Sequence, residues 1–345
     1  VFKGVTLVLH NGEKEISTVQ VFELSKLVLN TTSLVEEEKM LMKLAPHIVC
    51  KIWGGNKLNS LKSKNSSEPI GESWEVSALN EGPSYYQKRP LSELVEFEKL
   101  PYLIKLIDTS DYLSVQVHPD ESYAKQHENS QGKTECWLIL DAAPGAGIYL
   151  GFKPGVEKEK FEKAIRSQED LTPFLRFFPV KRGDFFFVPA GSVHAIGKDV
   201  FLAEVQESSG ITYRVWDWNR LENGKPRALH IDKALDVLNF ASEANETMNF
   251  RVRENLFLFN GEERLLEEKL FNMDLMNLIP NETWEREIAN EKRHMSILGL
   301  EGEGKIILGS EEISFGAYEA VLILAESQGR LEIQAKDKCS FIFVS

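Results

Sequence analysis

Short apolar segments separated by turn-forming residues constrain the fold of this chain more than any other feature. Runs such as PYLIKLI (101–107), CWLILD (136–141) and VFLAEVQ (200–206) are rich in aromatic and β-branched residues, and Gly, Pro, Asp or Asn residues separate them. A chain with many short strands and few helices buries its apolar faces in a sandwich or a barrel. The sequence therefore predicts a mainly β protein.

Two segments have helical periodicity instead. In residues 156–178, the apolar residues Phe161, Ala164 and Ile165 recur at i, i+3 and i+4 among charged residues. The same spacing occurs in residues 231–241. We expect the first of these segments to be a small helical insertion between strands.

The order of the segments predicts two barrels. We place a first, larger domain at residues 40–240, with the helical insertion near 156–178, and a smaller barrel at residues 245–345. Residues 1–39 show no sustained period, so they are either an extension that precedes the domain or an ordinary pair of N-terminal strands. The sequence leaves these two interpretations open.

Composition excludes some classes of function. The formal net charge of −13 and the pI near 5.2 disfavour nucleic-acid binding, which normally requires a basic face. No apolar run is long enough for a membrane span. The 3 cysteines are widely spaced and form no CxxC pair, so we expect a cytoplasmic protein without disulfides. An anionic ligand would therefore have to be bound by a few local Lys and Arg residues.

Four polar residues lie where predicted strands begin or end. Gln116 and His118 alternate in the run LSVQVH, which Pro119 ends, so both side chains lie on one face of a strand. Glu135 opens a later strand. In GDFFFVPAGSVH the strand ends before a Pro-Ala-Gly turn, which returns the chain to His194.

These four side chains supply two imidazoles, one carboxylate and one amide oxygen. Such a set suits Zn²⁺, Mn²⁺, Fe²⁺ or Co²⁺ and contains no thiolate, since Cys136 points to the opposite strand face from Glu135. Two imidazoles and one carboxylate leave coordination positions open, as in catalytic rather than structural metal sites. The alternative is that the four side chains satisfy one another and solvent at the rim of a barrel.

At this point the sequence resembles a known family. GDFFFVPAGSVH is similar to the second motif of the cupin superfamily. Together, LSVQVHPDE, KTE, PAGSVHAI and YRVWDW resemble type I mannose-6-phosphate isomerases in their short bacterial form, over most of residues 44–240 and in the family's order. The resemblance implies two cupin (jelly-roll) barrels, the first of them catalytic. It also favours the interpretation of residues 1–39 as an extension.

The resemblance implies a role for each matching residue. The zinc ligands would be Gln116, His118, Glu135 and His194. Arg214 would be the active-site arginine, and Lys133 would handle substrate or transfer a proton. The remaining pocket positions would be filled by Lys105 and Ser114 near the phosphate, by Trp53, Glu72 and Trp74 in the wall, and by Lys225 or Arg227 in place of a further lysine.

Two positions depart from the longer eukaryotic and enterobacterial members. Those proteins carry an acidic residue four before the arginine and a Tyr two after the His ligand, where this chain has Gly210 and Ile196. The role of that acid cannot be transferred, so the general base stays open, with Lys133 as the candidate. Arg214 has three open interpretations: stabilising the transition state, anchoring the phosphate, or stacking structurally on neighbouring aromatic residues.

The resemblance implies a zinc-dependent isomerase that interconverts mannose 6-phosphate and fructose 6-phosphate through an enediol. Its partner would be this small sugar phosphate, with no nucleic acid and no membrane. Two alternatives share the fold: a non-catalytic sugar-binding cupin, and a cupin oxygenase with Fe²⁺, which two histidines and one carboxylate also suit. The amide ligand and the candidate phosphate-binding cations favour the isomerase over both.

Overall fold

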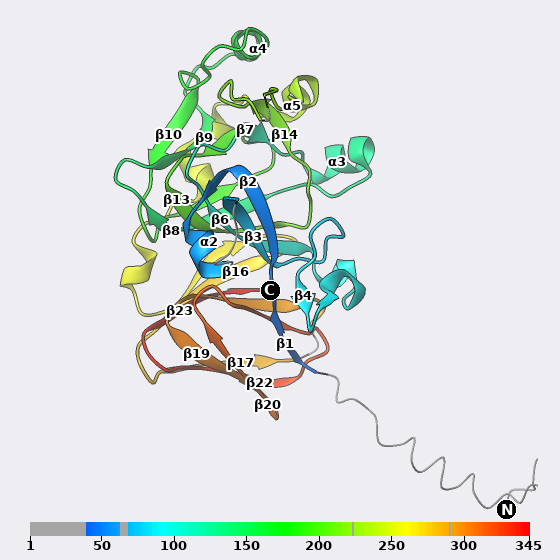
Figure 1. Cartoon of the computed structure of the whole chain (residues 1–345), viewed down its shortest axis with the longest axis vertical. Helices are drawn as coiled ribbons and strands as arrows, with labels where there is room; N and C mark the ends of the chain where they lie inside the picture. Colours follow the sequence, from blue (N-terminus) through cyan, green and yellow to red (C-terminus); the bar gives the residue numbers. More distant parts are fainter. Residues whose placement is uncertain (1–38, 63–67, 223, 290) are drawn as a thin grey trace, which may run out of the picture. The chain divides into compact units, whose positions relative to one another are not determined.

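Two six-stranded antiparallel sheets pack against each other at the centre of residues 40–345 (Figure 1). The structure is a computed structural model, and it describes residues 39–62, 68–222, 224–289 and 291–345. Residues Met40–Ser345 form one compact unit. The question about residues 1–39 falls, except for Lys39, outside the described residues.

The first barrel consists of one of these sheets and a five-stranded sheet. The six-stranded sheet has the spatial order β11 (Phe185–Val188), β8 (Glu135–Ala142), β13 (Val200–Glu207), β6 (Tyr102–Asp108), β3 (Ile70–Val76) and β2 (His47–Gly55). The five-stranded sheet has the order β10 (Leu175–Pro179), β9 (Gly147–Phe152), β12 (His194–Ile196), β7 (Val115–Val117) and β14 (Tyr213–Trp216). A small ribbon pairs β4 (Tyr85–Tyr86) with β5 (Arg89–Pro90).

The second barrel repeats this plan with a six-stranded and a four-stranded sheet. The six-stranded sheet has the order β1 (Leu41–Leu44), β21 (Ala320–Ile323), β18 (Met295–Glu301), β23 (Cys339–Val344), β16 (Asn272–Leu278) and β15 (Gly261–Glu267). The four-stranded sheet has the order β17 (Thr283–Ile288), β22 (Gly329–Ala335), β19 (Glu303–Leu308) and β20 (Glu311–Gly316). The predicted mainly β fold of two cupin barrels is confirmed.

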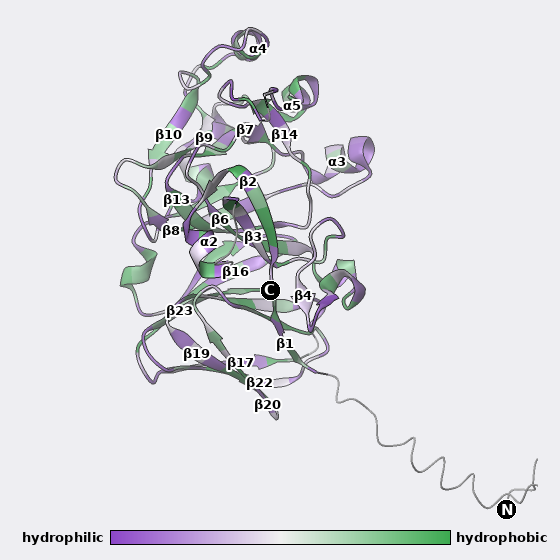
Figure 2. Cartoon of the chain, viewed as in Figure 1, coloured by the Kyte–Doolittle hydropathy of each residue, from purple (hydrophilic) through white to green (hydrophobic). Residues whose placement is uncertain are grey.

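Helices are few and peripheral. The described helical segments are α2 (Lys57–Lys62), α3 (Glu121–Glu128), α4 (Lys158–Arg166), α5 (Ile231–Val237) and the 3₁₀ turns Leu91–Glu93, Phe97–Lys99, Glu243–Asn245, Thr247–Phe250 and Leu256–Leu258. The expected insertion near 156–178 is the helix α4 followed by the strand β10. Figure 2 shows α3 as mostly hydrophilic, in line with its single buried residue, Ala124. None of the described helices is long and apolar enough to cross a membrane.

The packing of the two large sheets decides which side chains face the inside of the first barrel. On β13, Phe201, Ala203 and Val205 belong to the core that joins the two barrels, so Glu204 and Gln206 face the interior of the first. On β8, Cys136 and its alternate neighbours face the second barrel, which confirms its expected place in the core. Both strands are buried on both faces, so any polar residue on their inner face requires a polar partner.

One strand crosses the expected domain boundary. Residues Leu41–Leu44, which we placed with the first domain, form β1 and pair in register with β21 of the second barrel. The carboxylate of Glu311 also accepts hydrogen bonds from the main-chain amides of Met40 and Leu41, at 2.6 and 3.1 Å. Leu41 of β1 packs into the core of the second barrel, and Met42 and Leu44 pack into the core between the two barrels.

A chain that begins at Ala45 should therefore unfold at a lower temperature than one that begins at Met40. It loses an edge strand and the buried side chains of Leu41, Met42 and Leu44, each contributing about 1.5–3 kcal/mol. We expect a melting temperature at least about 5 °C lower, measured by calorimetry on both truncated chains. Equal melting temperatures would show that β1 adds nothing to the barrel.

Candidate metal centre

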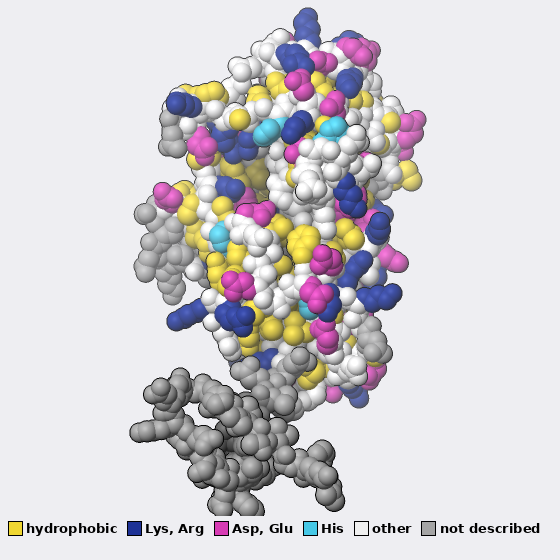
Figure 3. Space-filling view, turned by 90° about the vertical axis from the view of Figure 1, so that its right-hand side faces the viewer, with side chains coloured by type: hydrophobic (Ala, Val, Ile, Leu, Met, Phe, Trp, Pro, Cys, Tyr) yellow, Lys and Arg dark blue, Asp and Glu magenta, His cyan; other side chains and the backbone are white. Residues whose placement is uncertain are grey.

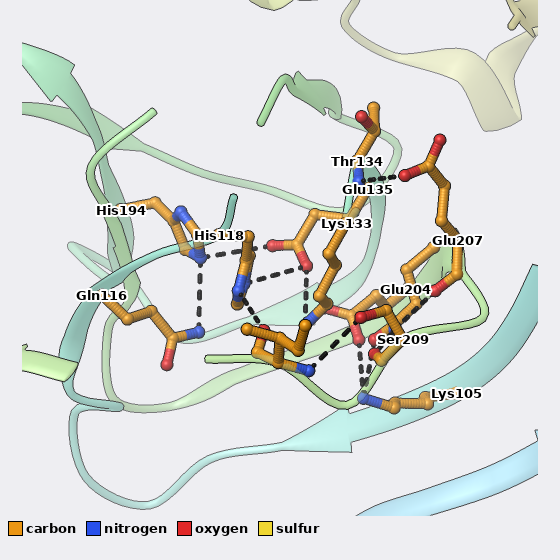
Figure 4. Close-up of polar contacts among 12 residues, drawn as sticks. Lys105, Gln116, His118, Lys133, Thr134, Glu135, His194, Glu204, Glu207 and Ser209 are labelled. Atoms are coloured by element: carbon orange, nitrogen blue, oxygen red, sulfur yellow. Dashed lines mark hydrogen bonds and ion pairs between the residues drawn. The ribbon is translucent and has the colours of Figure 1, made fainter. Parts of the chain in front are cut away.

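The first barrel gathers three of the predicted ligands in its interior (Figure 4). His118 follows β7, Glu135 begins β8 and His194 begins β12. One ligand atom from each of these side chains lies within 4.8 Å of the other two, and all three side chains are buried. They come from both sheets of the barrel, so only the closed fold brings them together.

Main-chain carbonyls fix the orientation of both imidazoles. Nδ1 of His118 lies 2.8 Å from the carbonyl oxygen of Ile211, and Nδ1 of His194 lies 2.9 Å from that of Ser192. Since a carbonyl only accepts, each Nδ1 carries the proton, and each Nε2 offers a free lone pair toward Glu135. The distances from these Nε2 atoms to the carboxylate oxygens are 3.4 Å for His118 and 3.3 Å for His194.

Three of the four atoms that converge here have no hydrogen-bond partner among the described residues. Within the described part of the chain, Nε2 of His118 and both carboxylate oxygens of Glu135 are buried without a hydrogen bond. Burial lowers the pKa of His118 well below its ordinary value and that of His194 to about 4, so both imidazoles are neutral at pH 7. Two unprotonated nitrogens facing a carboxylate leave a polar void that a divalent cation fits. The residues present therefore fit a metal.

Gln116, the fourth predicted ligand, lies beside this group. Its Cα pairs in register with that of His194, and its Nε2 lies 3.2 Å from Nε2 of the histidine. Its Oε1 accepts a hydrogen bond of 3.3 Å from the hydroxyl of Ser114. Rotating the side-chain amide by about 180° would exchange its oxygen and its nitrogen and turn the oxygen toward the other three predicted ligands.

A row of buried charged residues leads away from the ligands across the inner face of the large sheet. Nζ of Lys133 lies 3.1 Å from Oε2 of Glu135. Nζ of Lys105 lies 3.2 Å from Oε2 of Glu204 and 3.9 Å from Oε2 of Glu72. The signs alternate along the row, so each buried charge has an opposite charge beside it.

This row contains a residue that sequence reasoning missed. Glu204 is buried, accepts a hydrogen bond of 3.1 Å from Nε1 of Trp137, and lies between the strands that carry Lys105 and Glu135. Burial alone would raise the pKa of Glu204, but the ammonium groups of Lys105 and Lys133 hold it below its ordinary value. The signal in the sequence was a Glu at an inner-face position of the apolar run VFLAEVQ.

Of the three residues expected in the pocket wall, Glu72 and Trp74 lie beside Lys105 and Trp53 does not. Glu72 accepts a hydrogen bond of 2.8 Å from Nε1 of Trp74, and Nζ of Lys105 lies 4.8 Å from the centre of the Trp74 ring. Trp53, in contrast, is buried in a hydrophobic cluster with Ile107 and other apolar residues. The structure therefore places Trp53 in the core and not among the polar side chains of the site.

Arg214 lies on the strand next to Gln116. The two residues are register partners on β14 and β7, so their side chains share one face of the sheet. Nη1 of Arg214 donates to the carbonyl of Ala228 at 2.9 Å, while Nε is buried and has no hydrogen-bond partner in the described chain. Burial and the charge of Arg227 lower the pKa of Arg214.

The two cations offered as phosphate ligands differ in placement. Lys225 is exposed, and its main chain pairs with Glu222. Arg227 is half-buried and donates from Nε to Asp217 at 2.7 Å. Neither shares a hydrogen bond or an ion pair with the ligand group, so their substrate-binding role stays a prediction.

Gly210, where the longer family members carry an acidic residue, has a carboxylate from another segment beside it. A Cβ atom added to Gly210 would lie 2.8 Å from Oε1 of Glu81. A carboxylate from a different segment thus stands against the main chain at this position, although Glu81 itself is exposed.

A jelly-roll barrel that directs two imidazoles and a carboxylate toward one interior point defines a cupin-type barrel with a metal-ligand group. Comparison with known proteins specifies the family. The family model for the catalytic domain of type I phosphomannose isomerase matches residues 41–136. The mannose-6-phosphate isomerase ManA of Bacillus subtilis is 33% identical over 307 residues, which are 84% of this chain and 94% of that protein.

Two further similarities agree with this one. The mannose-6-phosphate isomerase of Streptococcus mutans is 44% identical over 214 residues, covering 57% of this chain and 67% of that protein. The crystal structure of the mannose 6-phosphate isomerase from Bacillus subtilis has a TM-score of 0.74 at 28% identity, covering 89% of this chain and 100% of that one. This chain therefore belongs to the type I phosphomannose isomerase family and is an enzyme of that family.

Replacing His194 by Ala should abolish most metal binding. The change removes one of the converging ligand atoms and leaves Glu135 with a single imidazole beside it. We expect metal content by elemental analysis to fall at least about tenfold. His127→Ala is the matched control, because His127 lies on α3 and stacks on Tyr123 outside the group. A His194→Ala protein that is as fully loaded as the control would remove this ligand from the site.

Proposed function

We propose that this protein interconverts mannose 6-phosphate and fructose 6-phosphate through an enediol, with a zinc ion held by His118, Glu135, His194 and Gln116. The observation that carries the proposal is the buried group of unpartnered ligand atoms with Lys133 and Arg214 beside it. The names of the related proteins and the family support the choice of substrate.

When bound, the metal supplies Lewis acidity at the sugar oxygens and stabilises developing negative charge, worth several kcal/mol. The chain must then move a proton between C1 and C2. Lys133 is the candidate for this step, because its Nζ is buried beside the ligand carboxylate. It would take the proton from one carbon as the neutral amine and return it to the other carbon as the ammonium. The buried carboxylate of Glu204 would add a negative charge near Lys133.

The phosphate requires cations in a chain whose net charge is −13. Lys105 is the candidate cation inside the barrel and Arg214 a second, and the hydroxyl of Ser114 would add a hydrogen-bond donor. Figure 3 shows a face that is hollowed in its upper part, with Lys and Arg side chains beside the hollow, and such a local arrangement suits an anionic substrate.

The two alternatives have less support. A non-catalytic sugar-binding cupin would not need a buried lysine against the ligand carboxylate, and the chain belongs to a family of enzymes. An Fe²⁺ oxygenase would use the same two histidines and carboxylate, but Gln116 beside His194 and the buried Lys105 fit a metal-assisted reaction on an anion better. We also propose the cytoplasm as its location, since Cys50, Cys136 and Cys339 are free.

Removing divalent ions with a chelator should abolish isomerase activity, and added Zn²⁺ should restore it. Without the cation, the developing oxyanion loses stabilisation of several kcal/mol, which corresponds to a rate loss of about 10³-fold or more. A coupled assay with mannose 6-phosphate measures the loss and the recovery. Undiminished turnover by protein shown to be metal-free would exclude the Lewis-acid mechanism.

Arg214→Lys should lower kcat by about 10²-fold while metal content and melting temperature stay unchanged. Lysine keeps the charge but loses the planar fork, of which Nε is buried without a partner in the described chain and so is available for a substrate oxygen. Steady-state kinetics check this, with Arg176→Lys as the control. Arg176 also donates to a main-chain carbonyl, that of Asn245, but lies on the edge strand β10.

The other outcomes for Arg214→Lys separate its remaining interpretations. A raised KM with an unchanged kcat would assign Arg214 to binding the phosphate equally in the ground state and the transition state. Wild-type values of both constants would leave it a structural role only.

A further inference from the structure

Gln206 is a buried amide at the centre of the charged row. It lies on β13, where it is the register partner of the ligand Glu135 on β8 and of Leu103 on β6. Its side chain therefore shares the inner face of the sheet with that of Glu135. It is 0% exposed, so each of its polar atoms needs a partner within the protein.

Every polar atom of this amide is used. Oε1 accepts a hydrogen bond of 2.7 Å from Nζ of Lys105, while Nε2 donates to the carbonyls of Glu207 at 2.9 Å and Ser209 at 2.8 Å. The orientation of the amide is unambiguous, because an ammonium group only donates and a carbonyl only accepts. A carboxylate at this position would meet the carbonyls without a proton, and an apolar side chain would satisfy neither side.

The carbonyls that Gln206 holds belong to a loop that orients a metal ligand. This segment runs from Glu207, the last residue of β13, to Ile211, whose carbonyl accepts the Nδ1 proton of His118 at 2.8 Å. The hydroxyl of Ser209 in turn donates to Gln131 at 2.9 Å. Figure 4 shows Ser209 between Lys105 and the ligand histidines. The amide of Gln206 thus links Lys105 to the segment that orients His118.

We propose that Gln206 is a positioning residue that sets the place of the Lys105 ammonium relative to the metal ligand His118, and so the spacing between the phosphate end and the metal end of the substrate. This inference rests on the proposed function, since it requires a metal at His118 and a phosphate at Lys105. Without Gln206, Lys105 keeps its ion pair with Glu204 at 3.2 Å and moves toward that carboxylate. The loop loses two hydrogen bonds at the same time.

Gln206→Met tests both connections, because methionine has a similar length and no polar group that replaces the amide. We expect zinc affinity, measured by competition with a chelator in the absence of substrate, to fall at least about tenfold, as for other residues that orient metal ligands. We also expect KM to rise about tenfold while kcat at saturating zinc stays within about threefold.

Two comparison variants separate positioning from general damage. Ser208→Ala removes a buried hydroxyl from the same loop. This hydroxyl donates to the carbonyl of Leu100 at 3.1 Å and not to Gln206 or His118, so the change should leave zinc affinity and KM unchanged. Lys105→Met should raise KM but keep zinc affinity. In the double variant that combines Gln206→Met and Lys105→Met, KM should be close to that of Lys105→Met alone, because Gln206 affects KM through Lys105.

The outcomes distinguish this inference from the proposed function. If the wild type shows no metal-dependent isomerase activity, the proposed function fails. The link to His118 is still tested in that case, because lower zinc affinity in Gln206→Met supports it and wild-type zinc affinity contradicts it. If the wild type is active, wild-type zinc affinity and KM in Gln206→Met overturn the inference. Additive effects of Gln206→Met and Lys105→Met on KM overturn the link to Lys105.

A second variant covers the case in which Gln206→Met does not fold. Gln206→Glu keeps the acceptor for Lys105 but cannot donate to both carbonyls of the loop. The added negative charge alone would strengthen cation binding, whereas a displaced loop weakens it. Weaker zinc binding with KM within about threefold of wild type supports the inference, and equal or tighter zinc binding contradicts it.

Discussion

Burial of the large sheet of the first barrel on both faces is the constraint on which the site depends. The outward residues of β6, β8 and β13 pack against the second barrel, and their inward residues face a barrel interior. Buried polar groups in either place cost free energy when they have no partner, so each inward polar side chain requires a partner in the chain, a ligand or bound water. The result is a row in which Lys105, Glu204 and Lys133 are paired with opposite charges, whereas Nε2 of His118 and both oxygens of Glu135 have no hydrogen bond within the described chain.

The second barrel shows that the fold alone does not create this site. Its interior is filled by apolar residues that include Trp284, Phe315, Phe341 and Phe343. The single group of potential metal ligands found among the described residues lies in the first barrel. The first barrel therefore differs from the second in its inward residues and not in its architecture, and the site depends on those few positions.

The sequence predicted the parts of the site that local spacing encodes. Gln116 and His118 share a strand face because strand side chains alternate, and the turn before His194 is visible in its Pro and Gly. Spacing could not show that β1 pairs with a distant strand or that Trp53 is buried in the core. Glu204 and Gln206 were missed because their roles depend on neighbouring strands, and strand order is a long-range property that no local pattern records.

Counting charges along the row connects its packing to the substrate. The buried row holds Lys105 and Lys133 against Glu72, Glu204 and Glu135, and Lys51, whose side chain is 34% exposed, pairs with Glu72 at its end, so the formal charge is between −1 and 0. A divalent cation at the ligand group would leave an excess of one to two positive charges, which is unfavourable in a buried region without an anion nearby. A phosphate monoester carries about two negative charges at pH 7. A sugar phosphate that spans the metal position and Lys105 would therefore restore neutrality, whereas a neutral sugar would not. The charge balance thus agrees with the phosphorylated substrate proposed above, while the place of its phosphate at Lys105 rests on the family resemblance.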